Sequence, residues 1–257
     1  PPYFGTMFAL LLIPIGLALP LGIYSRWQSD KMARLMRDLA VPAVFGVMTA
    51  LAVAFWLPDA GGWGIAGSAA GIWIIAASVR QYIDRLTHVK TQRPSRSETG
   101  MTLAHLGVGV FLIGASLTNP VSEEKHLRMV AGDAFELAGY NFVFEGTRGV
   151  QGPNYVADEG EFIVYKDGVR VTSLYPQKRR YSSGQVMTEA ALDPGLTRDL
   201  YVSLGEPLDD RGTAWAIRIY HKPFIRFIWL GALMMMAGGF LAASDRRYRR
   251  ASREAAA

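Results

Sequence analysis

The sequence contains no cysteine among its 257 residues and only four histidines. Without cysteine, the chain has no disulfide framework and no thiol chemistry of its own. Common motifs of soluble enzymes are also missing: there is no G-x-S-x-G, no H-E-x-x-H and no glycine-rich phosphate loop before a lysine. Three pairs of neighbouring acids have no histidine at a metal-ligand spacing, and we interpret them as solvated turns: Glu123-Glu124, Asp158-Glu159 and Asp209-Asp210.

Charged residues are almost absent from five long apolar stretches. A helix of about 20 apolar residues is long enough to cross the hydrocarbon core of a membrane. The chain as a whole is 50% hydrophobic, with the apolar residues concentrated in these stretches. We therefore predict a polytopic α-helical membrane protein with spans over residues 4–24, 39–57, 63–83, 101–118 and 224–243.

The short connections between these spans differ in charge. Lys and Arg are frequent in residues 26–37, in residues 80–96 and in the tail after the last span, whereas the turn at 58–62 has none. Basic connections stay on the cytoplasmic side, which predicts five spans with the N-terminus out and the C-terminus in. The net charge of +5 reflects these connections rather than an aromatic-interleaved basic patch, so we exclude nucleic-acid binding.

Between the fourth and fifth spans the composition changes to charges, glycine and short alternating runs. Alternation of apolar and polar residues indicates antiparallel strands, and Lys166-Asp167-Gly168 is a hairpin-turn signal. We predict strands over residues 135–144, 161–166, 169–174, 200–204 and 214–220.

These strands suit a small antiparallel β barrel or sandwich on the periplasmic side. The predicted organisation is a four-helix transmembrane region (1–118), a periplasmic β-rich domain (119–222), and a last transmembrane helix with a basic cytoplasmic tail (223–257).

One histidine, His105, lies inside the apolar, glycine-spaced run at residues 100–118. An ionisable ring in hydrocarbon is costly unless it has a partner, which makes His105 a functional candidate. Three interpretations compete: a hydrogen bond to another helix, a proton or ion relay, and metal or haem ligation with a second ligand from another helix. The spans hold almost no other ionisable residue, which disfavours a relay and leaves the other two open.

The helix around His105 has a recognisable start. Ser95 and Glu98 form an S-x-x-E capping box, which predicts that the helix begins just after Pro94. With a rise of 1.5 Å per residue, His105 then lies about 6 to 8 Å past Met101, nearer the inner surface. An adjoining stripe of small residues lets another helix approach closely or leaves a slot for a flat ligand. That stripe consists of Gly100, Ala104, Gly107 and Gly114.

The other three histidines are weaker candidates. His126 and His221 lie at the edges of the β-rich segment, where an exposed or interfacial histidine is expected. His88 lies in a basic connection, and we expect it to be solvated.

The run GMTLAHLGVGVFLIG, the opening PPYFGTMF and the closing YHKPFIRFIWLGALMMMAGGFLAASDRRYR together resemble the C-terminal part of the CcmF family. CcmF proteins are the large membrane subunits of the bacterial cytochrome c maturation haem lyase. The resemblance covers essentially the whole chain, including GDAFELAGYNFVFEG in the β-rich segment. Paralogues dedicated to particular multihaem cytochromes share the same features.

The resemblance implies a role in attaching haem, delivered by a periplasmic chaperone, to the CXXCH cysteines of apocytochrome c. It also implies a b-type haem held by two transmembrane histidines, of which His105 matches the second through its A-H-L-G setting. The resemblance further implies thiol-handling subunits as partners and the bacterial inner membrane as the location. We expect quinol as an electron donor, because His105 lies toward the inner side.

Other family features are missing from this sequence. The tryptophan-rich outer segment, its two flanking histidines and the first transmembrane histidine are not found, and the chain does not begin with methionine. We therefore expect it to be part of something longer, not catalytic alone, with the second haem ligand outside it. The alternative is a non-catalytic scaffold that recruits apocytochrome and thiol-handling subunits while His105 only packs.

Overall fold

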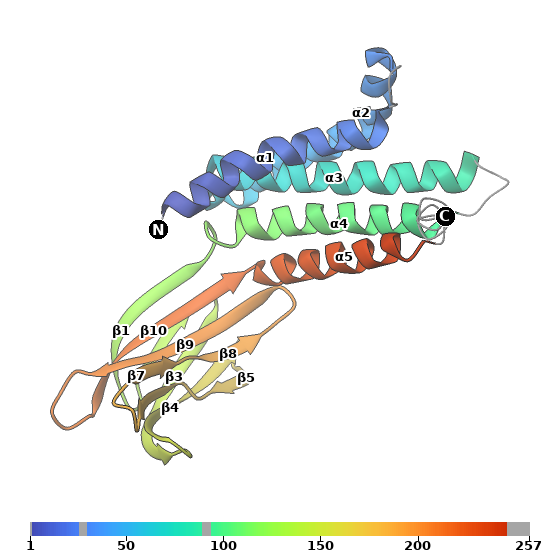
Figure 1. Cartoon of the computed structure of the whole chain (residues 1–257). Helices are drawn as coiled ribbons and strands as arrows, with labels where there is room; N and C mark the ends of the chain where they lie inside the picture. The colour runs from blue at the N-terminus through green and yellow to red at the C-terminus, as the bar shows by residue number, and fades with distance from the viewer. Residues whose placement is uncertain (1, 26–29, 89–93, 246–257) are drawn as a thin grey trace, which may run out of the picture. The chain divides into compact units, whose positions relative to one another are not determined.

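The computed structural model describes residues 2–25, 30–88 and 94–245 (Figure 1). It divides into two compact units, a β unit over Ser122–Pro223 and a helical unit formed by the segments before and after it. Parts of the predicted basic connections, at 26–29 and 89–93, and the basic tail from 246 lie outside the described residues.

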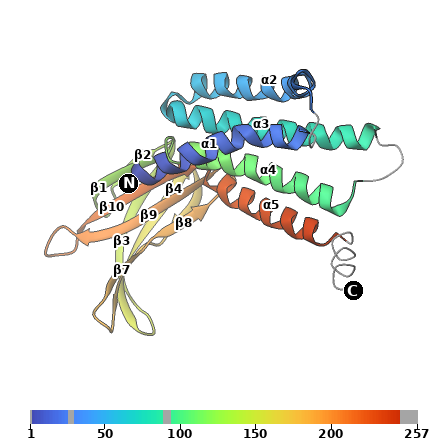
Figure 2. The same ribbon diagram turned by 45° about the horizontal axis from the view of Figure 1, so that its top comes forward.

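The helical unit contains five α-helices and one short 3-10 turn among the described residues. α4 lies between α3 and α5 in both views (Figures 1 and 2). The helices are α1 (Pro2–Tyr24), α2 (Met32–Trp56), α3 (Gly61–His88), α4 (Arg96–Leu117) and α5 (Ile225–Ala243), with the 3-10 turn at Pro58–Ala60.

Four described helices are long and apolar enough to cross a membrane: α2, α3 with its preceding turn, α4 and α5. α1 is helical over the first predicted span, but its described side chains make a shorter apolar segment, Leu10–Tyr24. The first predicted span, residues 4–24, and the orientation of the helices stay predictions.

α2 begins at Met32, well before the predicted start at residue 39. Arg34 explains the difference, because it pairs with Asp30 and with Asp38, its neighbours one turn away on each side. Such pairs support a charged helical turn that an apolar pattern does not predict. Arg34 also donates a hydrogen bond to the carbonyl of Tyr24, 2.8 Å away, which ties α2 to the end of α1.

The predicted start of α4 is confirmed. Ser95 is the N-cap, and the reciprocal hydrogen bonds of a capping box with Glu98 are both present. Glu98 also pairs with Arg85 of α3, so the start of α4 is fixed to its neighbour.

α4 and α5 pack closely through glycine. A Cβ placed on Gly107 would lie 2.7 Å from the carbonyl oxygen of Gly231, and one on Gly238 would lie 2.5 Å from that of Gly100. Distances this short leave no room for a side chain, so the two backbones are in contact. Small residues at such positions let helices approach where lipid gives no hydrophobic driving force.

The β unit consists of two antiparallel sheets, so it is a sandwich rather than a barrel. One sheet has the order β1-β10-β9-β8 and the other β2-β3-β4-β6-β7, with β5 paired to β4. The strands are β1 (Glu123–Val130), β2 (Ala134–Leu137), β3 (Tyr140–Gln151), β4 (Tyr155–Lys166), β5 (Val169–Leu174), β6 (Gln177–Tyr181), β7 (Val186–Glu189), β8 (Ala191–Pro194), β9 (Arg198–Pro207) and β10 (Ala214–Pro223).

The core of the sandwich is aromatic and aliphatic. Phe144 of β3 and Phe162 of β4 are stacked with their ring centroids 4.8 Å apart, and both are fully buried. Leu204 and Ile217 of the other sheet are buried in the same cluster. Inward-facing residues of both sheets therefore form one continuous core.

Two predicted turns had different outcomes. The β4–β5 hairpin at Asp167-Gly168 is confirmed, with φ of 51° and 76° at the two turn residues. The prediction of a single strand over 135–144 is wrong, because Ala138 and Gly139, with φ of 51° and 75°, turn the chain between β2 and β3. Positive φ at both positions is the geometry of a two-residue hairpin turn.

Candidate functional site

His105 is the tenth residue of α4, about 13 Å along the helix axis from Arg96. Its side chain is half-buried, and its ring atom Nδ1 is fully buried with no hydrogen-bond partner. Within the described residues the ring makes no hydrogen bond or ion pair. The interpretation of His105 as a hydrogen-bonding link between helices therefore has no partner in this part of the chain.

The predicted stripe of small residues faces away from His105. Gly100, Gly107 and Gly114 pack against the backbone of α5. Successive residues of an α-helix are about 100° apart, so His105 lies about 160° around the helix from Gly107. A flat ligand on His105 would thus not occupy the glycine stripe, because α5 already does.

His105 instead shares a face with Gly109, which packs against α3. A Cβ on Gly109 would lie 2.6 Å from both the carbonyl oxygen of Gly71 and the side chain of Ile75. Leu112, two turns beyond His105, is buried against Ala70 and Ile74 of the same helix. The ring therefore lies beside the contact between α3 and α4.

The other histidines differ in their surroundings. His126 is exposed on β1, and its Nε2 lies 2.6 Å from Glu124, whose pKa this hydrogen bond holds below its usual value. His221 on β10 has a buried Nδ1 without a partner, and burial lowers its pKa. His88 is the last residue of α3, and its side chain lies outside the described part.

Two acid pairs interpreted as turns lie in strands instead. Glu123 and Glu124 begin β1, and Asp158 and Glu159 belong to β4. Glu159 is buried, which alone would raise its pKa, but hydrogen bonds from Gln177 and Arg148 outweigh burial and leave the pKa lowered.

The third pair does lie in a turn. Asp209 accepts hydrogen bonds from the Thr213 hydroxyl and from the backbone amides of Thr213 and Ala214. Within the described residues, no group of three or more ligating side chains is placed to hold a metal ion.

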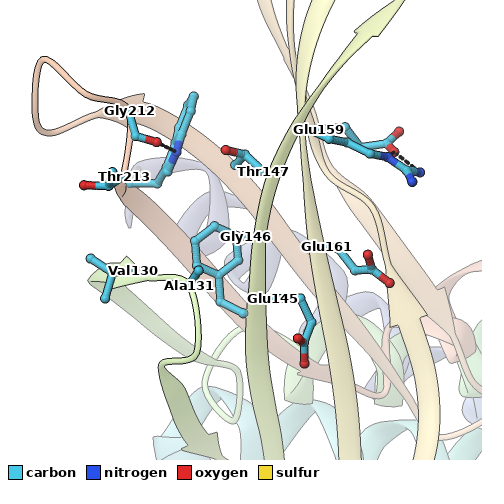
Figure 3. Close-up of a pocket in the computed structure, with 12 residues that line it drawn as sticks. Val130, Ala131, Glu145, Gly146, Thr147, Glu159, Glu161, Gly212 and Thr213 are labelled. Atoms are coloured by element: carbon cyan, nitrogen blue, oxygen red, sulfur yellow. Dashed lines mark hydrogen bonds and ion pairs between the residues drawn. The ribbon is translucent and has the colours of Figure 1, made fainter.

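The sandwich contains a cleft of about 520 Å³ between β1 and β10 on one side and β3 and β4 on the other (Figure 3). We call it the sandwich cleft, lined by Val130, Ala131, Phe144, Glu145, Gly146, Thr147, Arg148, Glu159, Glu161, Gly212, Thr213 and Trp215. Its apolar lining includes the buried Phe144 and Trp215 and the more exposed Val130 and Ala131, and its charges come from three glutamates and one arginine.

The charges in the sandwich cleft do not cancel. Arg148 lies 2.6 Å from Glu159 and neutralises it. Glu161 accepts only a long hydrogen bond from Tyr175, at 3.4 Å, and neither Glu161 nor Glu145 forms an ion pair within the described chain. A strand irregularity between Phe144 and Gly146 sets the pairing of Gly146 with Glu161, which places Glu145 and Glu161 on the same cleft. With three glutamates and one arginine, the cleft has an excess of negative charge, which favours a cation with an apolar stem.

The described residues form apolar helices able to span a membrane, with a β sandwich inserted between the last two of them, and a half-buried histidine whose Nδ1 has no partner among them. These features define the class: a multi-helix membrane protein with a β domain. Residues 120–223 match a family model described as the CcmF C-terminal beta-sandwich.

Curated relatives extend the match over the rest of the chain. The cytochrome c-type biogenesis protein CcmF of Pseudomonas aeruginosa is 41% identical over 254 residues, covering 97% of this chain and 38% of the relative. CcmF of Escherichia coli is 37% identical over 252 residues, with the same coverage of 97% and 38%. The chain thus spans about two fifths of the length of these relatives.

A paralogue and a solved structure complete the comparison. The cytochrome c-type biogenesis protein NrfE of Haemophilus influenzae is 33% identical over 143 residues, covering 55% of this chain and 22% of the relative. A structure of the cytochrome c haem lyase CcmF has a TM-score of 0.74 at 16% identity, covering 94% of this chain and 40% of that one. The chain therefore contains a CcmF C-terminal β sandwich and is similar over nearly its whole length to part of the CcmF cytochrome c-type biogenesis proteins.

Proposed function

We propose that this chain is the C-terminal part of a cytochrome c haem lyase subunit, in which His105 provides one axial ligand of a b-type haem. The whole subunit would attach haem covalently to the CXXCH cysteines of apocytochrome c. The observation that carries the proposal is the His105 ring, which is half-buried in an apolar helix with no hydrogen-bond partner in the described chain. An imidazole whose partner is a bound cofactor would have this environment when the cofactor is not considered.

The surroundings of His105 fit an axial ligand. A neutral imidazole is a common ligand of haem iron, and an apolar helix favours the neutral ring. Bound at this position, haem supplies a one-electron couple whose potential depends on its axial ligands and burial. The described residues contain no cluster of three or more ligating side chains, and the proposal takes the second histidine from outside this chain.

The proposed setting follows the predicted topology. The helices lie in the bacterial inner membrane with the N-terminus out and the C-terminus in, and the sandwich lies in the periplasm. Partners there are the rest of the subunit, the haem-delivering chaperone, apocytochrome c and thiol-handling subunits. Quinol is the proposed electron donor, and failure of quinol to reduce the bound haem in purified protein would remove it from the scheme.

Replacement of His105 by alanine in the complete subunit tests the ligand. We expect loss of the bis-imidazole b-haem spectrum and of cytochrome c maturation, with the protein still inserted. Changes outside the first coordination shell already cost about 10- to 100-fold in metal affinity, so removal of the ligand should lower haem affinity at least about tenfold.

His126→Ala is the matched control, because it removes an exposed imidazole from the sandwich. It should keep full haem content. Full haem occupancy in His105→Ala would contradict the ligand proposal.

A second function, recruitment of a polypeptide by the sandwich, is favoured by the sandwich cleft. Glu145 and Glu161 form no ion pair in the described chain, although Arg148 acts on the charge of Glu161, and Val130 and Ala131 leave apolar surface open in the same cleft. A lysine or arginine side chain of apocytochrome c or of a thiol-handling subunit would place its aliphatic stem on the apolar lining of the cleft and its charge near the carboxylates.

The double variant Glu145→Gln and Glu161→Gln tests recruitment while keeping side-chain size. We expect binding of a basic partner to weaken about five- to tenfold and to lose part of its salt dependence, measured by co-purification and titration. Glu136→Gln, an exposed glutamate of β2 away from the cleft, is the control. Equal binding by both variants would exclude the cleft as the docking site.

A further inference from the structure

Buried polar atoms without partners are rare in the described chain. Four side-chain atoms are in this state: the Ser78 hydroxyl, one nitrogen of Arg80, and the Nδ1 atoms of His105 and His221. Ser78 and His105 belong to α3 and α4, two helices that pack against each other. Buried polar groups are nearly always hydrogen-bonded in folded proteins, so two unpaired groups on neighbouring helices need an explanation.

Ser78 and His105 lie at the same level along the two helices. Gly109 of α4 packs against Gly71 and Ile75 of α3, and Tyr82 lies 3.5 Å from Thr99 further along. From the Gly109 contact, Ser78 is about 5 to 10 Å forward along α3, and His105 is about 6 Å back along α4, because the helices are antiparallel. Both residues therefore lie between the same two interhelical contacts.

Ser78 also faces α4. It follows Gly71 by seven residues, which is nearly two full turns, so the two share one face of α3. Ser78 is 1% exposed. Arg80, two residues further on, lies on the opposite face and is 3.9 Å from Asp84 of its own helix, so it does not compete for His105.

The Ser78 hydroxyl has no hydrogen-bond partner among the described residues, unlike two other buried hydroxyls of α3 and α4. Ser68, also on α3 and 1% exposed, donates to the Gly64 carbonyl 2.7 Å away, and Thr102 on α4 donates to the Glu98 carbonyl at 3.0 Å. Serine in a helix normally makes this bond to the preceding turn. Ser78 makes no such bond, which leaves its hydroxyl available to another group.

We propose that Ser78 is a positioning residue for His105: its hydroxyl accepts a hydrogen bond from Nδ1–H when Nε2 of the same ring coordinates haem iron. This inference rests on the proposed haem ligation by His105. Histidine ligands of metals almost always donate their second ring N–H to a neighbouring oxygen, which fixes the tautomer and the ring plane. The two unpaired atoms are a matching donor and acceptor, because a serine hydroxyl oxygen accepts hydrogen bonds and a neutral imidazole donates one.

The test uses the complete subunit with Ser78→Ala, Ser78→Thr and the matched control Ser68→Ala. Ser78→Ala removes one atom, so the protein should still insert, with haem bound about 10- to 100-fold more weakly and the potential measured on the haem that remains. Loss of the hydrogen bond makes the imidazole a weaker donor to ferric iron, so the midpoint potential should rise. A tenfold weaker preference for the ferric state corresponds to a rise of about 59 mV in a one-electron couple.

Ser78→Thr keeps the hydroxyl and should keep the wild-type potential and low-spin electron paramagnetic resonance signal. Ser68→Ala should leave both unchanged, because that hydroxyl bonds its own helix. Equal potentials in all three variants would overturn the role of Ser78 while leaving His105 as a ligand. Full haem retention in His105→Ala would overturn the ligand itself, so the two failures are distinguishable.

Discussion

Large apolar side chains point inward in the β sandwich and outward in much of the helical unit. Phe142 and Phe162 of the sandwich are 0% exposed, whereas Phe55, Trp56 and Phe240 of the helices are 71% or more exposed. The sandwich is thus organised around an interior that water drives together. The helices, with lipid as apolar as their own side chains, depend on close backbone packing instead.

The two units also treat buried polar groups differently. In the sandwich, buried Glu159 is satisfied by Arg148 and Gln177. In the helical unit, Ser78 and His105 are buried without partners in the described chain. Ser68 and Thr102 of the helical unit bond their own helix, so the contrast between the units rests on Ser78 and His105, which the proposed haem site would complete. His221 is the exception within the sandwich.

Two neighbouring glycines of α5, Gly238 and Gly239, allow a direct test of whether the helices depend on close backbone packing. A Cβ on Gly238 would lie 2.5 Å from the backbone nitrogen of Ala104, whereas one on Gly239 would meet nothing within 4 Å. We expect Gly238→Ala to destabilise the helical unit by about 1 to 3 kcal/mol through overpacking. Gly239→Ala should be neutral or slightly stabilising, because alanine favours a helix by up to about 1 kcal/mol.

Thermal unfolding in detergent, followed by helical circular dichroism, measures the difference between the two variants. Equal stability of Gly238→Ala and Gly239→Ala would mean that α4 and α5 do not depend on backbone contact.

The pH dependence of sandwich stability tests the role of His221, and the expected effect is smaller than that of Gly238→Ala. Burial lowers the pKa of His221, helped by Arg198 and Lys166 and opposed by Glu123. Because the folded pKa lies below the ordinary value of about 6.5, the unfolded chain binds the proton more readily. The stability from neutral His221 is therefore present above about pH 6.5 and decreases as the pH falls toward the folded pKa.

Denaturant midpoints of the sandwich between about pH 5 and 8 should fall toward acid in the wild type and less so in His221→Gln. His126→Gln, which changes an exposed histidine, should keep the wild-type slope. A slope unchanged by His221→Gln would show that other groups set the pH dependence.

Elements with strong local signals could be predicted from the sequence. The capping box at Ser95 and Glu98 and the Asp167-Gly168 turn act over a few residues, so their sequence determines their geometry. The turn at Ala138 was missed, because alanine rarely adopts positive φ. β1 is not predicted, because its first residues, starting at Glu123, are charged and exposed, so the strand does not alternate between apolar and polar residues.

The parts of the site that depend on tertiary contacts could not be predicted. Glu145 and Glu161 line one cleft only because of the irregular pairing of β3 with β4. His105 was identified as an unusual residue, but Ser78 was not, because a serine in a helix normally bonds its own backbone. Only the three-dimensional arrangement reveals that its hydroxyl does not.

The pairing of β1 with β10 has a consequence for whether the sandwich can be removed from the helical unit. Glu123, just after the chain leaves α4, pairs with His221, just before it reaches α5. Paired residues of antiparallel strands lie about 5 Å apart, so the hundred-odd residues between them begin and finish at nearly one point. α4 and α5 contact each other directly through their own glycines. The sandwich could therefore be deleted and replaced by a short turn, and the two helices would still be connected as neighbours.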